Sequence, residues 1–423
     1  MFDRSRECAQ RLDREDPLSR LRAQFHIPRQ ADGSEAIYLC GNSLGLQPKR
    51  TAEYVSEFLK DWAAMGVRGH FEGAHPWLPY HEFLTAGLAA LTGAKPDEVV
   101  AMNSLTVNLH LMMVSFYRPT ALRYKILIED HAFPSDHYAV ESQIRYHGAD
   151  PANALIKIGP RPGEELIQDE DLFALIEREG SALALVLLPG VQYYTGQVLP
   201  MAEIAKRGHA VGAMVGFDLA HAIGNIVLDL HAWNADFACW CSYKYLNSGA
   251  GAVGGCFVHE RHLCDASLPR FAGWWGHDKA TRFRMGPDFR PIPTVEAWQL
   301  SNPPILSLAA IRASLDVFLE AGGMQPLRAK SEKLTGYLEY LLKVECADHI
   351  AIITPGEPAH RGAQLSLSIR SDKFSGREVF KRLAESGVAC DWREPNVIRI
   401  APTPLYNTFE EVYRFVHLLK GLL

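Results

Sequence analysis

The chain has 423 residues, of which 48% are hydrophobic and 22% are charged. These values are typical of a soluble globular protein that is long enough for two domains. The formal net charge of −6 gives no indication of binding to nucleic acid or to an anionic membrane. No stretch approaches the roughly 20 apolar residues of a membrane span, and the charged N-terminal segment lacks the apolar core of a signal peptide, so we expect a cytoplasmic protein.

The N-terminal part of the chain predicts two helices separated by a turn. Helical spacing extends over residues 1–25, and a second helix is expected over residues 48–64. Between them, Gly-Asn-Ser-Leu-Gly at residues 41–45 is by itself an ordinary turn. An irregular aromatic loop at residues 68–77 contains His70, and loops of this kind often shape binding sites.

Two strands follow, each with polar or aromatic residues after its end. Residues 99–102 form the first, and the next helix begins near Leu105 and Thr106. The free N–H groups of such a helix start suit a phosphate, although a plain helix cap explains the same residues. Residues 126–129 form the second strand, and Phe-Pro-Ser-Asp at residues 133–136 comes next. An aromatic ring in that place can stack on a pyridine ring.

Strands and helices then alternate along the chain. Strands are expected over residues 154–158 and 183–188, and helices over residues 170–179 and 201–207. This alternation predicts a mostly parallel sheet covered by helices.

The middle of the chain contains three short apolar runs, at residues 213–217, 237–241 and 256–258, which are typical of buried strands of a parallel sheet. Ligands of such sheets lie beyond the carboxyl ends of the strands, and Asp218 and Lys244 each follow such an end. A lysine there suits pyridoxal phosphate chemistry, because its amine forms a Schiff base with the aldehyde. An aspartate suits it as well, because its carboxylate holds the pyridine nitrogen protonated and makes the ring an electron sink.

A charged residue at a strand end is more often a cap or a solvated group, so the neighbours of Asp218 and Lys244 matter. Asp-x-x-His ending at His221 and Ser-Tyr-Lys at residues 242–244 strengthen the functional interpretation. Residues 249–254 match Gly-x-Gly-x-x-Gly, but an apolar run follows where a dinucleotide fingerprint needs a helix. We interpret these glycines as letting the backbone pass close to a lysine-bound cofactor.

The last third of the chain contains two further motifs and then a different order of predicted helices and strands. Gly-Trp-Trp-Gly-His at residues 273–277 suits the wall of an aromatic pocket, although a hydrophobic plug in a surface loop explains it as well. Beyond Ser-Asn-Pro-Pro at residues 301–304, long helices and then short strands predict a smaller α+β domain. Arg399 lies in the apolar segment 396–402, where a solvent-facing salt bridge and a bound carboxylate are the two interpretations.

The eight cysteines are scattered, and none forms a Cys-x-x-Cys pair. Four of them fall in or just after the apolar runs near Lys244. This distribution favours buried, reduced thiols in a cytosolic enzyme. It supports neither a disulfide framework nor a metal site.

Together the motifs resemble those of the kynureninases, which belong to the class V branch of the fold-type-I pyridoxal-phosphate enzymes. The resemblance extends over residues 41–406, and Cys-Ser-Tyr-Lys-Tyr-Leu-Asn-Ser-Gly at residues 241–249 is its most specific part. It implies an α/β fold with a mostly parallel mixed sheet in a large domain, plus a smaller α+β domain. We expect the large cofactor-binding domain at residues 36–304, the small domain at residues 305–423, and an N-terminal segment, residues 1–35, packed against the small domain.

The resemblance also implies an activity, the hydrolytic cleavage of the Cβ–Cγ bond of L-kynurenine or 3-hydroxykynurenine in tryptophan catabolism. The products are L-alanine and anthranilate, or 3-hydroxyanthranilate. Pyridoxal 5′-phosphate is the expected cofactor, bound covalently to Lys244. A homodimer with its active sites between the subunits is the expected assembly.

The resemblance assigns residues to roles. Lys244, Asp218 and Tyr243 are the expected catalytic residues, with Lys244 as the base for the α proton and Tyr243 as the donor of the last proton. The expected cofactor-binding residues are Leu105, Thr106, Phe133, Pro134, Ser135, Asp136, Asp218, His221, Tyr243, Lys244, Trp274 and Asn302. The expected substrate-binding residues are His70, His277, Asn302 and Arg399.

Two other functions fit parts of the pattern. A cysteine desulfurase, or another class V transferase, shares the fold. A desulfurase needs a reactive cysteine on a mobile loop, and the candidates Cys346 and Cys390 lie outside any Gly/Ser-rich loop. A binding protein without turnover is the third possibility, and the intact pair of Asp218 and Lys244 argues against it.

Overall fold

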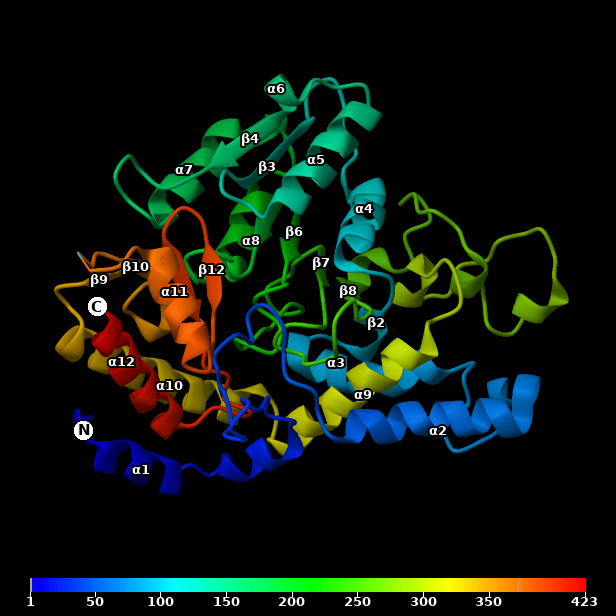
Figure 1. Cartoon of the computed structure of the whole chain (residues 1–423). Helices are drawn as coiled ribbons and strands as arrows, with labels where there is room; N and C mark the ends of the chain where they lie inside the picture. The colour runs from blue at the N-terminus through cyan, green and yellow to red at the C-terminus, as the bar shows by residue number, and fades with distance from the viewer. Residues whose placement is uncertain (1, 372) are drawn as a thin grey trace.

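A seven-stranded sheet forms the centre of the computed structural model, which describes residues 2–371 and 373–423 (Figure 1). The strand order is β2-β8-β7-β6-β5-β3-β4. The strands are β2 (Val99–Ala101), β3 (Lys125–Glu129), β4 (Leu155–Ile158), β5 (Leu183–Pro189), β6 (Met214–Asp218), β7 (Phe237–Trp240) and β8 (Gly255–Val258). Strands β3 to β7 are parallel, so the prediction of a mostly parallel mixed sheet is confirmed.

Strand β8 departs from the expectation for the third apolar run. It pairs antiparallel with both β7 and β2, so its assignment to the parallel part of the sheet was wrong. A parallel connection needs a crossover over one face of the sheet, usually by a helix. The segment 241–254 contains no helix, so the chain returns directly alongside β7 in the opposite direction.

Helices cover both faces of the large sheet. Helices α4 (Leu105–Phe116) and α5 (Pro134–Tyr146) pack on one face, while α7 (Asp169–Glu179) and α8 (Met201–Ala210) pack on the other. Strand β5 contributes side chains to the hydrophobic cores on both faces of the sheet, because successive side chains of a strand point to opposite faces.

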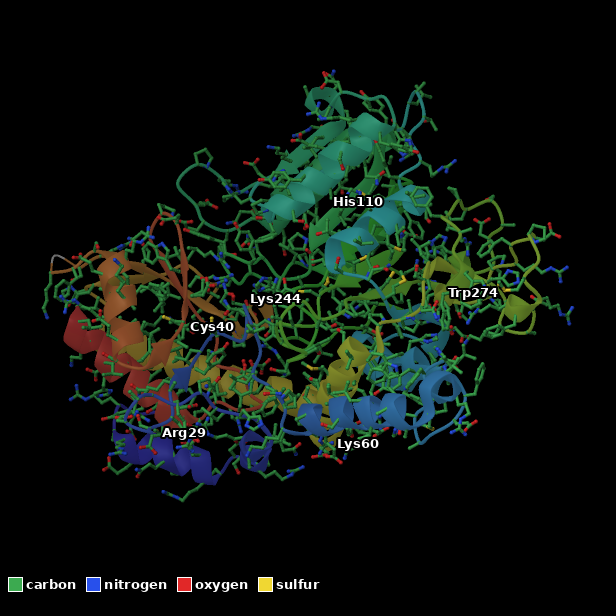
Figure 2. All side chains as sticks on the ribbon, turned by 45° about the vertical axis from the view of Figure 1, so that its right-hand side comes forward. Arg29, Cys40, Lys60, His110, Lys244 and Trp274 are labelled. Atoms are coloured by element: carbon green, nitrogen blue, oxygen red, sulfur yellow. The ribbon has the colours of Figure 1, made fainter. Side chains whose placement is uncertain are left out.

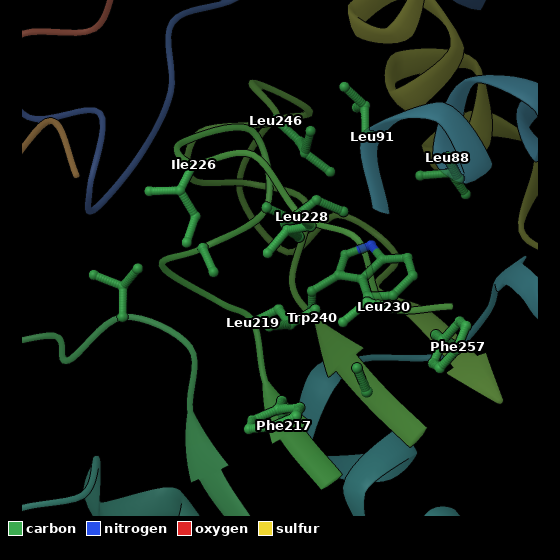
Figure 3. Close-up of a cluster of buried hydrophobic side chains, with 14 of the residues drawn as sticks. Leu88, Leu91, Phe217, Leu219, Ile226, Leu228, Leu230, Trp240, Leu246 and Phe257 are labelled. Atoms are coloured by element: carbon green, nitrogen blue, oxygen red, sulfur yellow. The ribbon is translucent and has the colours of Figure 1, made fainter. Parts of the chain in front are cut away.

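One of these cores continues beneath the loops that follow β6 and β7. Phe217, Trp240 and Phe257 lie in it together with leucines from those loops (Figure 3). Full burial of each large apolar side chain stabilises the fold by roughly 1.5–3 kcal/mol. The loops that carry Asp218 and Lys244 are therefore anchored on a packed core.

A second, four-stranded antiparallel sheet occupies the C-terminal part of the chain, in the order β12-β13-β10-β9. Helices α10, α11 and α12 share its hydrophobic core. The elements are β9 (Ile350–Ile352), β10 (Leu365–Ile369), β12 (Asp391–Arg393), β13 (Val397–Ile400), α10 (Met324–Glu345), α11 (Gly376–Glu385) and α12 (Phe409–Leu422). A short parallel pair, β1 (Ile37–Tyr38) and β11 (Val388–Ala389), connects this part with the N-terminal region.

The N-terminal helix α1 (Arg6–Arg14) lies against α12. The Asp13 carboxylate accepts hydrogen bonds from the N–H groups of Phe409 (2.7 Å) and Glu410 (2.9 Å) at the start of α12. Helix α9 (Ile305–Glu320) packs on α2 (Arg50–Met65) and α3 (Thr85–Thr92) of the large part. The division of the chain at residue 305 stays a prediction. None of the helices among the described residues combines the length and the apolar character needed to cross a membrane.

Candidate active site

A cavity of about 200 Å³ lies at the carboxyl ends of β3, β5 and β6. Figure 2 places Lys244 near the middle of the molecule, between the large sheet and the C-terminal part. The cavity is lined by nine residues that the sequence predicted for the site, which are Leu105, Thr106, Phe133, Ser135, Asp136, Asp218, His221, Tyr243 and Lys244. Pro134 opens α5 beside them.

The amine of Lys244 faces a histidine. Its Nζ atom lies 3.0 Å from Nε2 of His221. Burial, and then the positive charge of Lys244, hold the pKa of His221 well below its usual range. The imidazole is therefore neutral at physiological pH and accepts a hydrogen bond from the amine. The pair holds the amine at one end of the cavity.

Two carboxyl groups, from Asp136 and Asp218, also line the cavity. Burial raises the pKa of Asp136 well above its usual range, and the neighbouring carboxylate of Asp218 adds to the effect. Burial also raises the pKa of Asp218, while Lys244 and the N–H of Ala220 (2.7 Å from Oδ1) oppose the rise. Asp136, whose pKa is raised more strongly, therefore carries the proton of the pair and donates a hydrogen bond to the ionised carboxylate of Asp218. Such a pair suits a cationic nitrogen, which needs one net negative charge.

The starts of helices α4 and α5 meet at the cavity wall. The hydroxyl groups of Thr106, at the start of α4, and Ser135, at the start of α5, lie 2.8 Å apart. The Ser104 side chain does not cap α4, which leaves the first N–H groups of that helix free of a side-chain partner. Two helix N-termini with two hydroxyl groups form a site for a phosphate dianion.

The glycine-rich segment closes in beneath this helix start. A Cβ atom on Gly254 would lie 2.4 Å from the carbonyl oxygen of Trp240 and 3.3 Å from the nitrogen of Leu105. Only glycine lets the backbone pass this close to the end of β7 and the first turn of α4.

The residues present fit pyridoxal phosphate. An amine, a carboxyl pair and a phosphate cradle surround one cavity, and each matches one functional group of that cofactor. Phe133 adds an aromatic ring at the cavity wall, with its edge toward Tyr193 at a centroid distance of 5.5 Å.

Comparison with known proteins identifies the family. The kynureninase C-terminal domain family matches residues 327–419. The chain is 58% identical to the kynureninase of Koribacter versatilis (strain Ellin345), over 98% of this chain and 97% of the relative. It is 56% identical to the kynureninase of Myxococcus xanthus (strain DK1622), over 100% of this chain and 98% of the relative.

The chain belongs to the kynureninase family.

Solved structures with the same fold include proteins outside the kynureninases. A mutant of C-DES with glycine covalently linked to its pyridoxal-phosphate cofactor superposes with a TM-score of 0.77 at 18% identity, over 95% of this chain and 99% of that chain. The cysteine desulfurase from Thermococcus onnurineus NA1 gives 0.74 at 18% identity, over 98% and 97%. At 18% sequence identity, these two similarities show a shared fold only.

Arg399 does not line the cavity but contacts the backbone of Tyr193, which does. It is 1% exposed, its Nε donates to Oδ1 of Asp391 (2.8 Å), and one terminal nitrogen donates to the carbonyl oxygen of Tyr193 (2.6 Å). Its other terminal nitrogen, NH2, is buried and has no hydrogen-bond partner among the described residues. The salt bridge expected as one interpretation is present, but the side chain is buried and one donor stays available for an anion.

Besides Pro134 and Arg399, four predicted residues do not line the cavity of the same chain. Trp274 lies in an arm far from Lys244 (Figure 2), and its Nε1 donates to the carbonyl oxygen of Arg282 (3.3 Å). His277, in the same arm, is hydrogen-bonded to Thr281 (2.9 Å). The other two are His70, which packs edge-on against Trp77, and Asn302, which is exposed.

The cavity residues that the sequence analysis did not assign to the site include Tyr193 and Glu129. Tyr193 follows β5 and faces both Phe133 and His221. Glu129 is the last residue of β3 and is 2% exposed. Their only signal in the sequence was a position at or shortly after the end of a buried strand, and Asp218 occupies a similar position.

Proposed function

We propose that the chain hydrolyses the Cβ–Cγ bond of L-kynurenine or 3-hydroxykynurenine, using pyridoxal 5′-phosphate bound to Lys244. The observation that carries the proposal is the cavity in which Lys244, the pair of Asp136 and Asp218, and two helix starts converge. It occurs in a chain that is 58% identical, over nearly its full length, to a kynureninase. The products are L-alanine and anthranilate or 3-hydroxyanthranilate.

When bound, the cofactor supplies an electron-withdrawing ring that stabilises negative charge next to the substrate amine. The ionised Asp218 holds the ring nitrogen in its protonated form, and Asp136 supports it by donating a hydrogen bond. Lys244 takes the α proton, and His221 keeps the amine in place because Nε2 accepts its hydrogen bond.

Tyr243 is the proposed donor of the last proton. Burial raises the pKa of its phenol above the usual range, so the group stays protonated at neutral pH. Nζ of Lys244 lies 5.8 Å from the centre of its ring, which places both groups at the same end of the cavity. Donation from Tyr243 to Cβ completes L-alanine.

Arg399 is the proposed site for the substrate α-carboxylate. Asp391 and the carbonyl oxygen of Tyr193 fix the guanidinium, and NH2 remains to donate to a bound carboxylate. Holding the carboxylate there orients the α C–H bond relative to Lys244.

A second copy of the chain completes the proposed site. The aromatic arm, residues 270–290, exposes large apolar side chains: Phe271, Trp274, Phe283, Met285 and Phe289. Exposed groups of this kind mark interaction surfaces. We propose a homodimer in which the arm of one copy brings Trp274 and His277 to the cavity of the other, because neither reaches Lys244 of its own chain.

The two cysteines considered for the competing function, cysteine desulfuration, are unsuited to it. Burial raises the pKa of Cys346 to about 11, and burial also raises the pKa of Cys390. A nucleophilic cysteine needs a lowered pKa and access to solvent. The eight free cysteines are instead those of a protein in a reducing compartment, which supports a cytoplasmic location.

The test is an assay of the purified chain with added pyridoxal phosphate. L-kynurenine and 3-hydroxykynurenine are supplied in turn, and the fluorescent aminobenzoate product is measured, with sulfide release from L-cysteine as the control. Product from either ketone and no sulfide is the expected result. Sulfide without aminobenzoate would overturn the proposal.

A further inference from the structure

Glu129 is a buried acid at the cavity that the proposed chemistry leaves unused. It ends β3, and together with Tyr193 it lines both the cavity of Lys244 and a neighbouring cavity of about 360 Å³. The two residues therefore form the wall between these cavities. Burying a charged carboxylate is costly unless it is paired, and this carboxyl group is only 2% exposed, so its protonation state matters.

Gln192 determines which oxygen of Glu129 is free. Oε1 of Gln192 accepts hydrogen bonds from the backbone N–H groups of Tyr194 and Thr195, both at 2.6 Å. These groups only donate, so they fix the orientation of the amide. Nε2 of Gln192 then points to Oε1 of Glu129 and donates to it at 2.9 Å. The remaining oxygen, Oε2 of Glu129, is buried and has no partner among the described residues.

The surroundings of Glu129 are mostly acidic. Burial raises the pKa of Glu129 to about 7, with Gln192 opposing the rise and Asp130 adding to it. In turn, the charge of Glu129 raises the pKa of Asp136 and of Tyr193. Across the neighbouring cavity stand His131, Glu164, Glu165 and Glu394, and on the Lys244 side Asp218, His221 and Lys244 itself.

We propose that Glu129 is a positioning residue that carries a proton on Oε2 in the free chain and ionises when the cationic cofactor ring enters the cavity. The inference rests on the proposed function. The broken bond is O–H of Glu129, and the proton leaves to water through the neighbouring cavity. The new carboxylate adds negative charge beside Asp136 and Asp218, which strengthens their hold on a protonated ring nitrogen.

The variant Glu129→Gln tests the proposal, because an amide has the shape of the protonated acid and cannot ionise. The measurement is the dissociation constant of pyridoxal phosphate, by equilibrium dialysis, for both chains across about pH 5 to 8.5. At low pH the wild-type group is neutral as well, so the ratio of variant to wild-type constants approaches one. As the pH rises, the ratio increases and then levels off. The final ratio is about tenfold for each pH unit by which cofactor binding lowers the pKa of Glu129.

Glu165→Gln is the matched control, since Glu165 faces only the neighbouring cavity and is exposed. Its ratio stays near one at every pH. A ratio for Glu129→Gln that is the same at both ends of the range overturns the inference and leaves the proposed function intact. A wild-type chain that binds no pyridoxal phosphate overturns both.

Infrared spectroscopy of the wild-type chain gives a second readout that needs no turnover. Titration of the cofactor-free chain through neutral pH is expected to show loss of a protonated-carboxyl band, and adding pyridoxal phosphate below neutral pH removes the same band. Because Asp136 is protonated as well, the band of Glu129 is identified as the part of the signal that the Glu129→Gln variant lacks. If the wild-type and variant spectra show the same protonated-carboxyl signal, the inference is overturned.

Discussion

Nζ of Lys244 donates a hydrogen bond of 3.0 Å to Nε2 of His221, and both groups lie in the wall of one cavity. The contact joins the loop after β7 to the loop after β6. It depends on a neutral imidazole, because a protonated ring has no lone pair to accept from the amine. Burial and the charge of Lys244 provide that neutral state by lowering the pKa of His221.

In His221→Gln, the free energy of unfolding is expected to decrease less than in the wild type as the pH falls below neutral. The pKa of His221 is lower in the folded chain than its unfolded value of 6.5, so below that pH the unfolded chain binds more protons. Stability is fully present above pH 6.5 and falls as the pH drops toward the folded pKa, by up to about 1.4 kcal/mol per pH unit. Glutamine keeps an acceptor and does not titrate. Thermal unfolding of both chains without cofactor measures the difference, and equal slopes between about pH 7.5 and 5 would contradict the assignment.

Lys244→Ala is expected to bind pyridoxal phosphate without a covalent bond and to lose turnover, because the attaching amine and the α-proton base are the same group. Borohydride reduction followed by peptide mapping is the measurement. The wild-type chain should carry the label on Lys244 and the variant none. A label on another lysine would refute the assignment.

Asp218→Asn is expected to keep the cofactor and lower kcat by a factor of about 10² or more, since an amide cannot hold the ring nitrogen protonated by charge. Asp136→Asn is the matched variant. Asp136 already carries the proton of the pair, and an asparagine N–H can donate to Asp218 in its place. Its kcat should therefore fall by less than about tenfold. The order of the two effects is the decisive comparison, and a reversed order would show that Asp136 is the ionised partner.

The sequence predicted the residues whose local context is distinctive. Lys244 and Asp218 each follow a short apolar run, and the neighbouring motifs, Asp-x-x-His ending at His221 and Ser-Tyr-Lys at residues 242–244, distinguish them from ordinary charges at strand ends. Thr106 and Ser135 were predictable for a similar reason, because each begins a helix after a strand. Such signals depend on a few neighbouring residues, and the fold preserves them.

What the sequence did not predict depends on distant parts of the chain. The position of β8 between β7 and β2 depends on pairing with a strand more than a hundred residues earlier. Glu129 resembles a solvated charge at a strand end until Gln192 and Tyr193 fold over it. Arg399 alternates with apolar residues, yet Asp391 on the neighbouring strand and the Tyr193 carbonyl bury it.

A mixing experiment tests the proposed homodimer, in which the arm of one copy completes the cavity of the other. Lys244→Ala lacks the amine and Trp274→Ala lacks the proposed arm contact, so each homodimer should be inactive or nearly so. In a mixed dimer, one of the two cavities receives both intact residues if the arm acts on the partner chain. When equal amounts of the two variants are dissociated and reassembled together, half of the dimers are mixed and each of these has one intact cavity. About a quarter of the wild-type activity should therefore return. No recovery, with mixed dimers demonstrated by tagged pull-down, would place Trp274 in the site of its own chain or outside both.

Arg399→Lys is expected to weaken substrate binding while leaving cofactor binding unchanged. Arg399 is held by Asp391 and the Tyr193 carbonyl and has one buried donor, NH2, without a partner. Lysine retains the charge, but its compact ammonium cannot hold Asp391 and a substrate carboxylate in the same fixed geometry. The loss of one charge-assisted hydrogen bond corresponds to a decrease in kcat/KM of about 10- to 100-fold, most of it in KM.

Arg393→Lys is the matched control for this prediction, because Arg393 also pairs with Asp391 (3.1 Å) but is half-buried. Its effect on KM should be small, as expected for a partly exposed ion pair. L-Alanine separates binding from cleavage, since it carries the same α-carboxylate and has no bond to break. Rapid mixing with L-alanine, followed by the absorption of the bound cofactor, should show weaker binding in Arg399→Lys than in the wild type. If the two chains respond to L-alanine at the same concentrations, the α-carboxylate binds elsewhere and Arg399 serves only to anchor Asp391 and the loop of Tyr193.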